Sequence, residues 1–302
     1  MKPSSTSSME TIRPYLSPAF DPHSLAVEVA HAAESLVDRI GALEVPISYQ
    51  DLEKMAALRM IKQISKVRMN CGGSLIPIRG GFLVQLDSAQ NEERTRTSLA
   101  HEIGHTFFYD NDRDVPRPIY WDKGGSRNVK AEEGLSWVAA RTLLAPTQVL
   151  QETLKQDKNW PSIQGLLSLI RKFEVSPQIM IRRLQDLDSE RPKAMGHAAI
   201  YSIHVSRTET NGPQAIGLRT KVWKFGKMKK MVAFNMNGPN VKLDRLLRLM
   251  EPRSLSEPYE SEEILVRGEL GKIPTARYNF GCAWEDRSKA NLLAIVSGIG
   301  NS

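Results

Sequence analysis

The stretch Thr97-Ser98-Leu99-Ala100-His101-Glu102-Ile103-Gly104-His105 decides how this chain is interpreted. Apolar residues recur around it at helical spacing, which predicts a helix over Thr95–Tyr109. Residues four apart in a helix differ by about 40° in direction, so His101 and His105 project side by side and can share one metal ion. Glu102 lies beside the two histidines rather than on the opposite face of the helix.

These residue types suit one kind of chemistry. Neutral imidazoles are ligands for Zn²⁺, and the free carboxylate of Glu102 can take a proton from water whose pKa the ion lowers to about 7. The combination is typical of zinc peptidases. The alternative is a helix with two unrelated histidines. The apolar flanks, Leu99 and Phe107-Phe108, favour the metal site over this alternative.

A catalytic zinc site needs a third protein ligand and an open position. No histidine lies between His105 and His197, which excludes a third histidine shortly after the motif and indicates a carboxylate from a following helix. Glu132 and Glu133, at the start of a helix expected over Ala131–Leu144, are the leading candidates. Three aspartates just past the motif are weaker candidates: Asp110, Asp112 and Asp114.

The composition is that of an ordinary globular protein. Apolar residues make up 41% of the chain and charged residues 25%, which argues against a disordered chain. Its length of 302 residues favours two or three compact units. The formal charge of +7 favours acidic partners, including nucleic acid, although many basic proteins bind none.

Several absences bear on the compartment. Cys71 and Cys282 form neither a metal-binding spacing nor a disulfide framework, which indicates a reducing cytoplasm. Residues Met1–Pro18 are rich in Ser, Thr and Pro but lack the apolar core of a signal peptide. No run of about 18 to 20 apolar residues occurs, so we expect no membrane span.

Hydrophobic periodicity divides the chain into four parts. We expect a flexible tail over 1–20, a metallopeptidase core over 21–157, a helical segment over 158–191 and an α+β domain over 195–302. The overall fold class is therefore α+β. The core should contain helices at Pro22–Ile40, Tyr49–Ile64, Thr95–Tyr109, Ala131–Leu144 and Thr147–Lys155, a hairpin within Ser74–Leu86 and a long loop over Asn111–Val129.

Two later segments have a composition that could suit nucleic acid. Helices expected at Ile163–Phe173 and Pro177–Leu187 have the spacing of a helix-turn-helix, with Ser176 able to cap the second helix. The basic residues around this pair are Arg171, Lys172, Arg182 and Arg183. They could contact phosphates, but a solvated helix face is the favoured interpretation. The segment Arg219–Lys230 interleaves basic and aromatic residues, which suits either base stacking or a plain basic hairpin.

Beyond a linker at Pro192–Met195, the sequence alternates as strands do. Strands are expected at Ala198–Val205, Lys229–Asn235, Glu262–Gly268 and Asn291–Ser297, with a helix at Leu243–Met250. His197 and His204 stand at the start of this part without a supporting acid or cysteine, so we expect them to be structural.

The Thr97–His105 stretch, followed by Glu133 and then Leu143-Leu144-Ala145-Pro146, resembles the ImmA/IrrE metallopeptidase family. In that family a helix ending in Leu-Leu-Met-Pro carries the third zinc ligand at the position that matches Glu133. The resemblance therefore implies Glu133, rather than Glu132, as the third ligand. This chain departs from the family pattern at Ser136-Trp137, where Ala-Asn or Cys-Asn is frequent, and at Ala145, where Met is usual.

The order of parts resembles the IrrE branch of the family. It implies a zincin-like peptidase core, a helix-turn-helix-like segment and a C-terminal GAF-like sensor domain. It also implies a zinc-dependent endopeptidase that cleaves a repressor protein and so switches on stress-response or mobile-element genes. Tyr120, in the loop between the ligand helices, could polarise the substrate carbonyl or simply pack. The alternative function is a non-catalytic DNA-binding transcriptional regulator in which zinc is structural.

Overall fold

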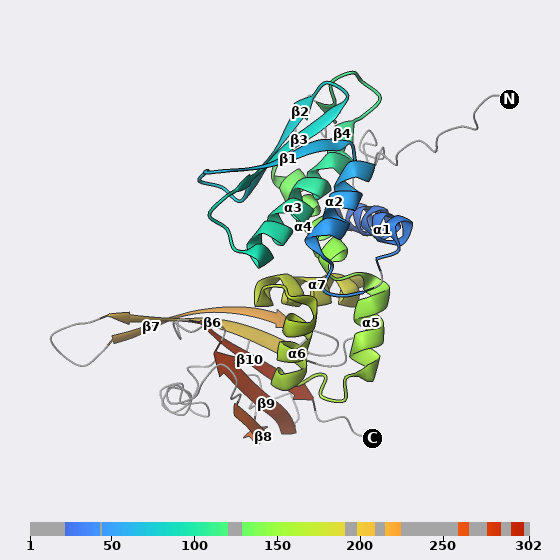
Figure 1. Ribbon diagram of the computed structural model, residues 1–302. Coiled ribbons are helices and arrows are strands. Elements are labelled where there is room, and N and C mark those ends of the chain that lie inside the picture. The colour runs from blue at the N-terminus through green and yellow to red at the C-terminus, as the bar shows by residue number, and fades with distance from the viewer. Residues whose placement is uncertain are drawn as a thin grey trace. The chain divides into compact units, whose positions relative to one another are not determined.

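The computed structural model describes residues 22–42, 44–119 and 129–190, and the strands at 198–208, 215–224, 259–265, 277–284 and 291–298. It divides into two compact units, one formed by Met1–Leu150 with Lys172–Arg183, the other by Gln151–Arg171 with Leu184–Ser302. Helices and sheets occur together (Figure 1), which confirms the α+β class. The domain boundaries expected from the sequence stay predictions.

Several expectations fall outside the described residues. They are the tail over 1–20, the linker at Pro192–Met195, the strand at Lys229–Asn235, the helix at Leu243–Met250, and Tyr120.

The first unit combines helices with a small sheet. Its elements are α1 (Pro22–Ile40), α2 (Tyr49–Leu58), β1 (Ile61–Val67), β2 (Gly73–Ile78), β3 (Gly81–Asp87), α3 (Glu92–His105), the 3₁₀ helix η2 (Thr106–Phe108), β4 (Tyr109–Asp110), β5 (Arg117–Pro118) and α4 (Val129–Leu144). Helices α5 (Thr147–Gln156), α6 (Ile163–Phe173) and α7 (Pro177–Glu190) follow. The helices expected from periodicity are confirmed in position, with ends that shift by a few residues.

The main sheet of this unit has the strand order β1-β3-β2, with β1 parallel and β2 antiparallel to β3. The hairpin expected within Ser74–Leu86 is thus confirmed as β2 and β3. The central strand β3 carries the fully buried residues of the sheet: Phe82, Val84 and Leu86. Strand β2 forms one edge and lies against α3.

The expected helix Tyr49–Ile64 is wrong over its last six residues. Helix α2 ends at Leu58, and Met60 adopts a left-handed backbone conformation with φ of 62°, which stops the helix. The chain then enters β1 at Ile61. Ile61 and Ile64 continue the helical apolar spacing of α2, so periodicity alone extends the helix past its end.

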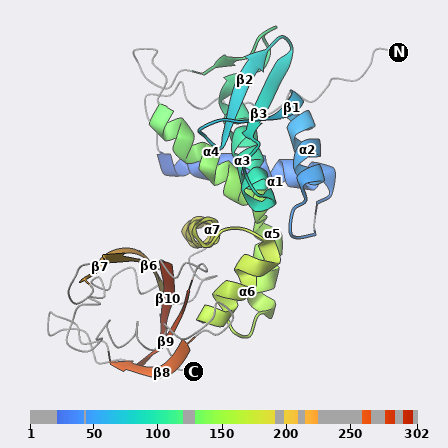
Figure 2. The same cartoon turned by 60° about the vertical axis from the view of Figure 1, so that its left-hand side comes forward.

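Helices α3 and α4 approach each other closely, as Figure 2 shows. The contact is made by small residues. A Cβ atom placed on Gly104 would lie 2.6 Å from the carbonyl oxygen of Ser136 and 3.1 Å from the Cβ of Ala139. Since Ser136 and Ala139 are themselves completely buried, they have little room to move away. Glycine at 104 is therefore what permits this helix spacing.

The C-terminal end of α3 is fixed by a buried arginine. Arg59 donates from Nε to the Thr106 hydroxyl at 2.9 Å and from Nη2 to the Thr106 carbonyl at 2.8 Å. Its guanidinium also lies 4.5 Å from the ring centroid of Phe107. These contacts hold the chain immediately after His105.

The N-terminal half of α3 is tied to the turn before α7. Arg96, which is buried, donates to the Glu174 carboxylate at 3.0 Å and to the Phe173 carbonyl at 3.3 Å. At the other side of this turn, the Ser176 hydroxyl accepts a hydrogen bond from the Ile179 amide at 3.3 Å. The expected capping role of Ser176 is confirmed.

Arg183 does not belong to the basic surface expected around the helix pair. Its side chain is completely buried, and it donates to the Ala145 carbonyl at 2.8 Å, to the Thr147 hydroxyl at 2.6 Å and to the Glu34 carboxylate at 3.2 Å. Arg183 is thus a structural link between α1, the start of α5 and α7. Among the four basic residues, Arg171, Lys172 and Arg182 are exposed.

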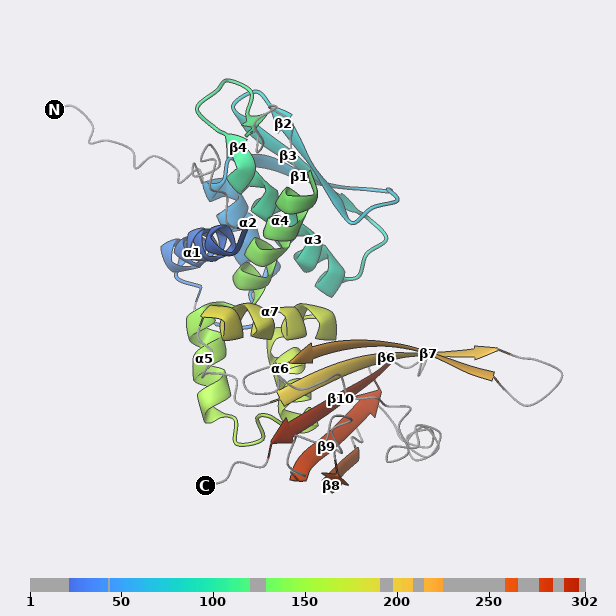
Figure 3. The ribbon, with the colours of Figure 1, turned by 180° about the vertical axis from the view of Figure 1, so that it is seen from behind.

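The second unit contains a five-stranded antiparallel sheet with the order β7-β6-β10-β9-β8 (Figure 3). The strands are β6 (Ala198–Thr208), β7 (Ala215–Lys224), β8 (Tyr259–Leu265), β9 (Arg277–Trp284) and β10 (Asn291–Gly298). Strands β6, β8 and β10 match expected strands. The basic segment from Arg219 to Lys224 lies in β7, paired with β6, so its described part forms one arm of a hairpin.

Two glycine substitutions should change stability in opposite directions. Gly104→Ala forces a methyl group against buried backbone, so the free energy of unfolding should fall by about 1–3 kcal/mol. Gly134→Ala is the matched control, because a Cβ at this exposed position of α4 meets nothing within 4 Å. The substitution also replaces a flexible residue in a helix. It should raise stability by roughly 0.5–1 kcal/mol. Urea denaturation of the metal-free proteins measures both; equal effects would contradict the packing argument.

Candidate metal centre

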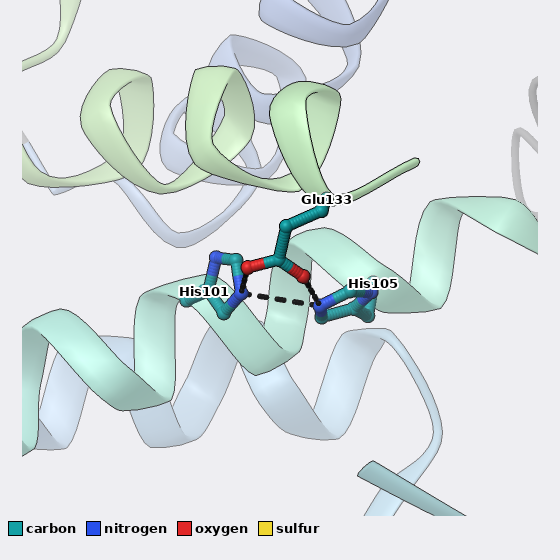
Figure 4. Close-up of side chains that lie close together, drawn as sticks. All are labelled: His101, His105 and Glu133. Atoms are coloured by element: carbon teal, nitrogen blue, oxygen red, sulfur yellow. Dashed lines mark hydrogen bonds and ion pairs between the residues drawn. The ribbon is translucent and has the colours of Figure 1, made fainter. Parts of the chain in front are cut away.

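Three side chains from two helices converge on one point. His101 and His105 come from the end of α3, and Glu133 comes from α4, just after its first turn (Figure 4). The Nε2 atoms of the histidines are 3.1 Å apart, and the Glu133 oxygens lie 3.1 Å from His101 Nε2 and 3.3 Å from His105 Nε2. The structure therefore brings together the three residues that the sequence suggested as ligands.

The donor atoms fit a small tetrahedral cation. An ion about 2.0–2.1 Å from two ligand atoms at a tetrahedral angle holds those atoms roughly 3.3 Å apart. The separations between the two Nε2 atoms and between His101 Nε2 and Glu133 Oε1, both 3.1 Å, are close to this value, and the other carboxylate oxygen, Oε2, lies 3.3 Å from His105 Nε2. The side chain of Glu133 is 49% exposed, so the point of convergence borders the surface, where a substrate can reach it. Within the described part of the chain, no other group of three such donors lies this close together.

Glu132 has a different place from Glu133. Its side chain is only 1% exposed, and its Oε1 atom lies 2.9 Å from His105 Nδ1. A carboxylate can only accept here, so Nδ1 of His105 carries the proton and the Nε2 lone pair faces His101 and Glu133. Glu132 thus orients one imidazole instead of joining the three converging donors.

Glu102 is buried beside the convergence point. Burial raises the pKa of its carboxyl to about 7, with a further rise from the charge of Glu133 and an opposing effect from His105. A Cβ on Gly73 would lie 2.7 Å from Glu102 Oε1, so a larger residue at the start of edge strand β2 would have to displace this carboxyl. Gly73 was not singled out from the sequence, although the Gly72-Gly73 pair is visible there.

The two histidines differ in their affinity for protons. Burial lowers the pKa of His101 to about 3, helped by the positive charges of His105 and Arg141. Burial also acts to lower the pKa of His105, but its hydrogen bond to Glu132 and the nearby carboxylates outweigh burial and raise it. A metal ligand must be unprotonated at the coordinating atom, so protons compete with a metal more strongly at His105 than at His101.

The weaker ligand candidates lie elsewhere. Asp110 pairs with Arg113 at 2.9 Å, and Asp114 pairs with Arg79 at 3.0 Å. Neither Asp110, Asp112 nor Asp114 belongs to the converging group among the described residues. Tyr120 lies outside the described residues.

Two imidazoles and a carboxylate around one point, next to a buried glutamate that is not among them, form a candidate mononuclear metal centre. A segment of 94 residues is 35% identical to the radiation response metalloprotease IrrE of Deinococcus radiodurans. This match covers 31% of the present chain and 28% of that protein, so the chain spans less than a third of this relative. No protein-family model matches the chain.

A solved structure is similar over most of the chain. It is a Mycobacterium tuberculosis transcriptional regulator, with a TM-score of 0.54 over 92% of this chain and 81% of that one. At 13% sequence identity this likeness concerns the fold alone. Among the residues that the structure describes, no helix has the length and apolar character needed to cross a membrane.

The raised pKa of Glu102 predicts that the stability difference between the wild type and Glu102→Gln depends on pH. A carboxyl whose pKa rises from 4.5 in the unfolded chain to about 7 in the folded one costs stability as the pH passes from 4.5 to 7. The full cost above pH 7 is about 3 kcal/mol. Metal-free Glu102→Gln protein should therefore match the wild type near pH 4 and be more stable at pH 8. Urea denaturation at both values tests this, and a difference independent of pH would contradict it.

Proposed function

We propose that this protein is a zinc-dependent endopeptidase of the HExxH type that cleaves a specific protein. The observation that carries the proposal is the convergence of His101, His105 and Glu133 within 4.8 Å, with the buried carboxyl of Glu102 beside them. Two nitrogen ligands and one carboxylate with one open side are typical of catalytic zinc, while structural zinc is held by four protein ligands. The partial identity to a metalloprotease supports the same assignment.

The residues divide the chemistry among them. Zinc, when bound, activates water and polarises the carbonyl of the scissile peptide bond. Glu102 accepts a proton from the attacking water at a carboxylate oxygen and donates it to the leaving amine. Glu132 keeps His105 in the tautomer that presents Nε2. We further propose Tyr120 as a hydrogen-bond donor to the substrate carbonyl.

The proposed biological role is regulatory. We infer that the substrate is a transcriptional repressor in the cytoplasm and that its cleavage switches on stress-response or mobile-element genes. The name of the Deinococcus relative, a radiation response metalloprotease, supports a link to stress. The five-stranded antiparallel sheet, with the first and last strands paired at its centre, supports a GAF-like sensor domain over residues 195–302.

A second candidate function is DNA binding by a regulator whose metal is structural. The likeness to a transcriptional regulator and the exposed Arg171, Lys172 and Arg182 favour it. The burial of Arg183 removes one of its expected phosphate contacts. A half-exposed third ligand is also poorly suited to a purely structural site, so the peptidase is preferred.

Separate variants test the base and the ligands. Glu102→Gln should keep zinc, measured by metal analysis, but lower cleavage of a repressor encoded beside the gene by at least about a hundredfold, because the general base is lost. Glu133→Ala should lose zinc, whereas Glu132→Ala should keep it with roughly 10–100-fold weaker affinity.

Two outcomes would reverse these assignments. If Glu102→Gln cuts as fast as the wild type, Glu102 is not the base. If the wild type cuts nothing but binds DNA with an affinity that falls steeply with salt, the regulator is the correct function.

A further inference from the structure

Trp137 contacts two of the three converging side chains. Its indole Nε1 donates to Glu133 Oε1 at 3.2 Å, one helical turn away along α4. Its ring also lies against the ring of His101, with centroids 4.2 Å apart and an angle of 30° between the planes. One side chain therefore touches a ligand on its own helix and a ligand on the facing helix.

The two histidines are oriented by different means. His105 has a buried carboxylate, Glu132, on the ring nitrogen that points away from the convergence point. The corresponding Nδ1 atom of His101 is buried and has no hydrogen-bond partner among the described residues. Metal-binding histidines usually depend on such a partner to fix the ring. For His101, the indole face of Trp137 is the contact that can supply this restraint.

Glu133 needs a restraint for another reason. Its side chain is 49% exposed, and an exposed glutamate samples many rotamers that must be given up when it binds a metal. The hydrogen bond from Trp137 reaches Oε1, which is also the oxygen that lies 3.1 Å from His101 Nε2. The indole thus holds the carboxylate facing the histidine.

We propose that Trp137 is a positioning residue that sets the zinc affinity of this centre, by orienting Glu133 through its N–H and His101 through its ring face. The proposal rests on the proposed zinc site, but not on any particular substrate. It assigns a role to a residue at which the chain departs from the family pattern. Both of these contacts are with proposed metal ligands, so the effect of Trp137 should appear in metal binding itself.

Three substitutions separate the two contacts. Trp137→Phe keeps an aromatic face but removes the N–H donor, Trp137→Gln keeps a donor one turn from Glu133 but removes the ring, and Trp137→Ala removes both. Zinc affinity, measured by competition with a chelator, should fall about tenfold in each of the first two variants and roughly a hundredfold in Trp137→Ala. Trp160→Phe, which makes the same chemical change outside the converging group, should leave the affinity unchanged.

Two further readouts distinguish positioning from plain packing. The midpoint of urea unfolding of the metal-free protein should be unchanged in Trp137→Phe. Bound Co²⁺ should quench the tryptophan fluorescence of the wild type, but much less that of this variant. The proposal is overturned if Trp137→Ala binds zinc as tightly as the wild type, or if Trp137→Phe loses stability but no zinc affinity. Failure of the wild type itself to bind zinc would instead overturn the proposed function.

Discussion

The close approach of α3 and α4 at Gly104 is the constraint on which the candidate site depends. Helix α3 carries both histidines, and α4 carries both Glu132 and Glu133, so the spacing of the two helices decides whether their side chains meet. That spacing leaves no room for a methyl group between Gly104 and the Ser136 carbonyl. The glycine inside the histidine motif is therefore a packing residue, and its effect on the metal centre is indirect.

The local part of the site could be predicted from the sequence, and the part that depends on tertiary contacts could not. Helical periodicity alone places His101 and His105 side by side. It cannot choose between Glu132 and Glu133, because neighbouring residues differ by about 100° in direction and the facing helix decides which one points at the histidines. The resemblance favoured Glu133, and the structure places Glu132 on the opposite nitrogen of His105. The contact of Trp137 with His101 has no sequence signal, since it joins two helices.

The fold shows the same division between local and long-range information. Helices with a strong apolar stripe, such as α6, could be predicted to the residue. Strand β1 could not be predicted, because Ile61 and Ile64 keep the apolar spacing of the preceding helix although Met60 has already ended it. The sequence did not predict β9, and it predicted β7 only in part, as an arm of a possible basic hairpin over Arg219–Lys230. Their pairing with neighbouring strands, β7 with β6 and β9 with β8 and β10, supplies what their own residue patterns do not indicate.

The charges around the candidate centre suit a cation. Three carboxyl groups, Glu102, Glu132 and Glu133, gather near two imidazoles, and burial keeps His101 neutral. Buried negative charge is costly unless it is compensated, and in the metal-free protein part of that compensation is a proton, because the pKa of Glu102 is raised to about 7. A divalent cation supplies the same compensation and favours loss of that proton. In the proposed peptidase, a bound cation would thus favour the ionised form of Glu102 that a general base requires.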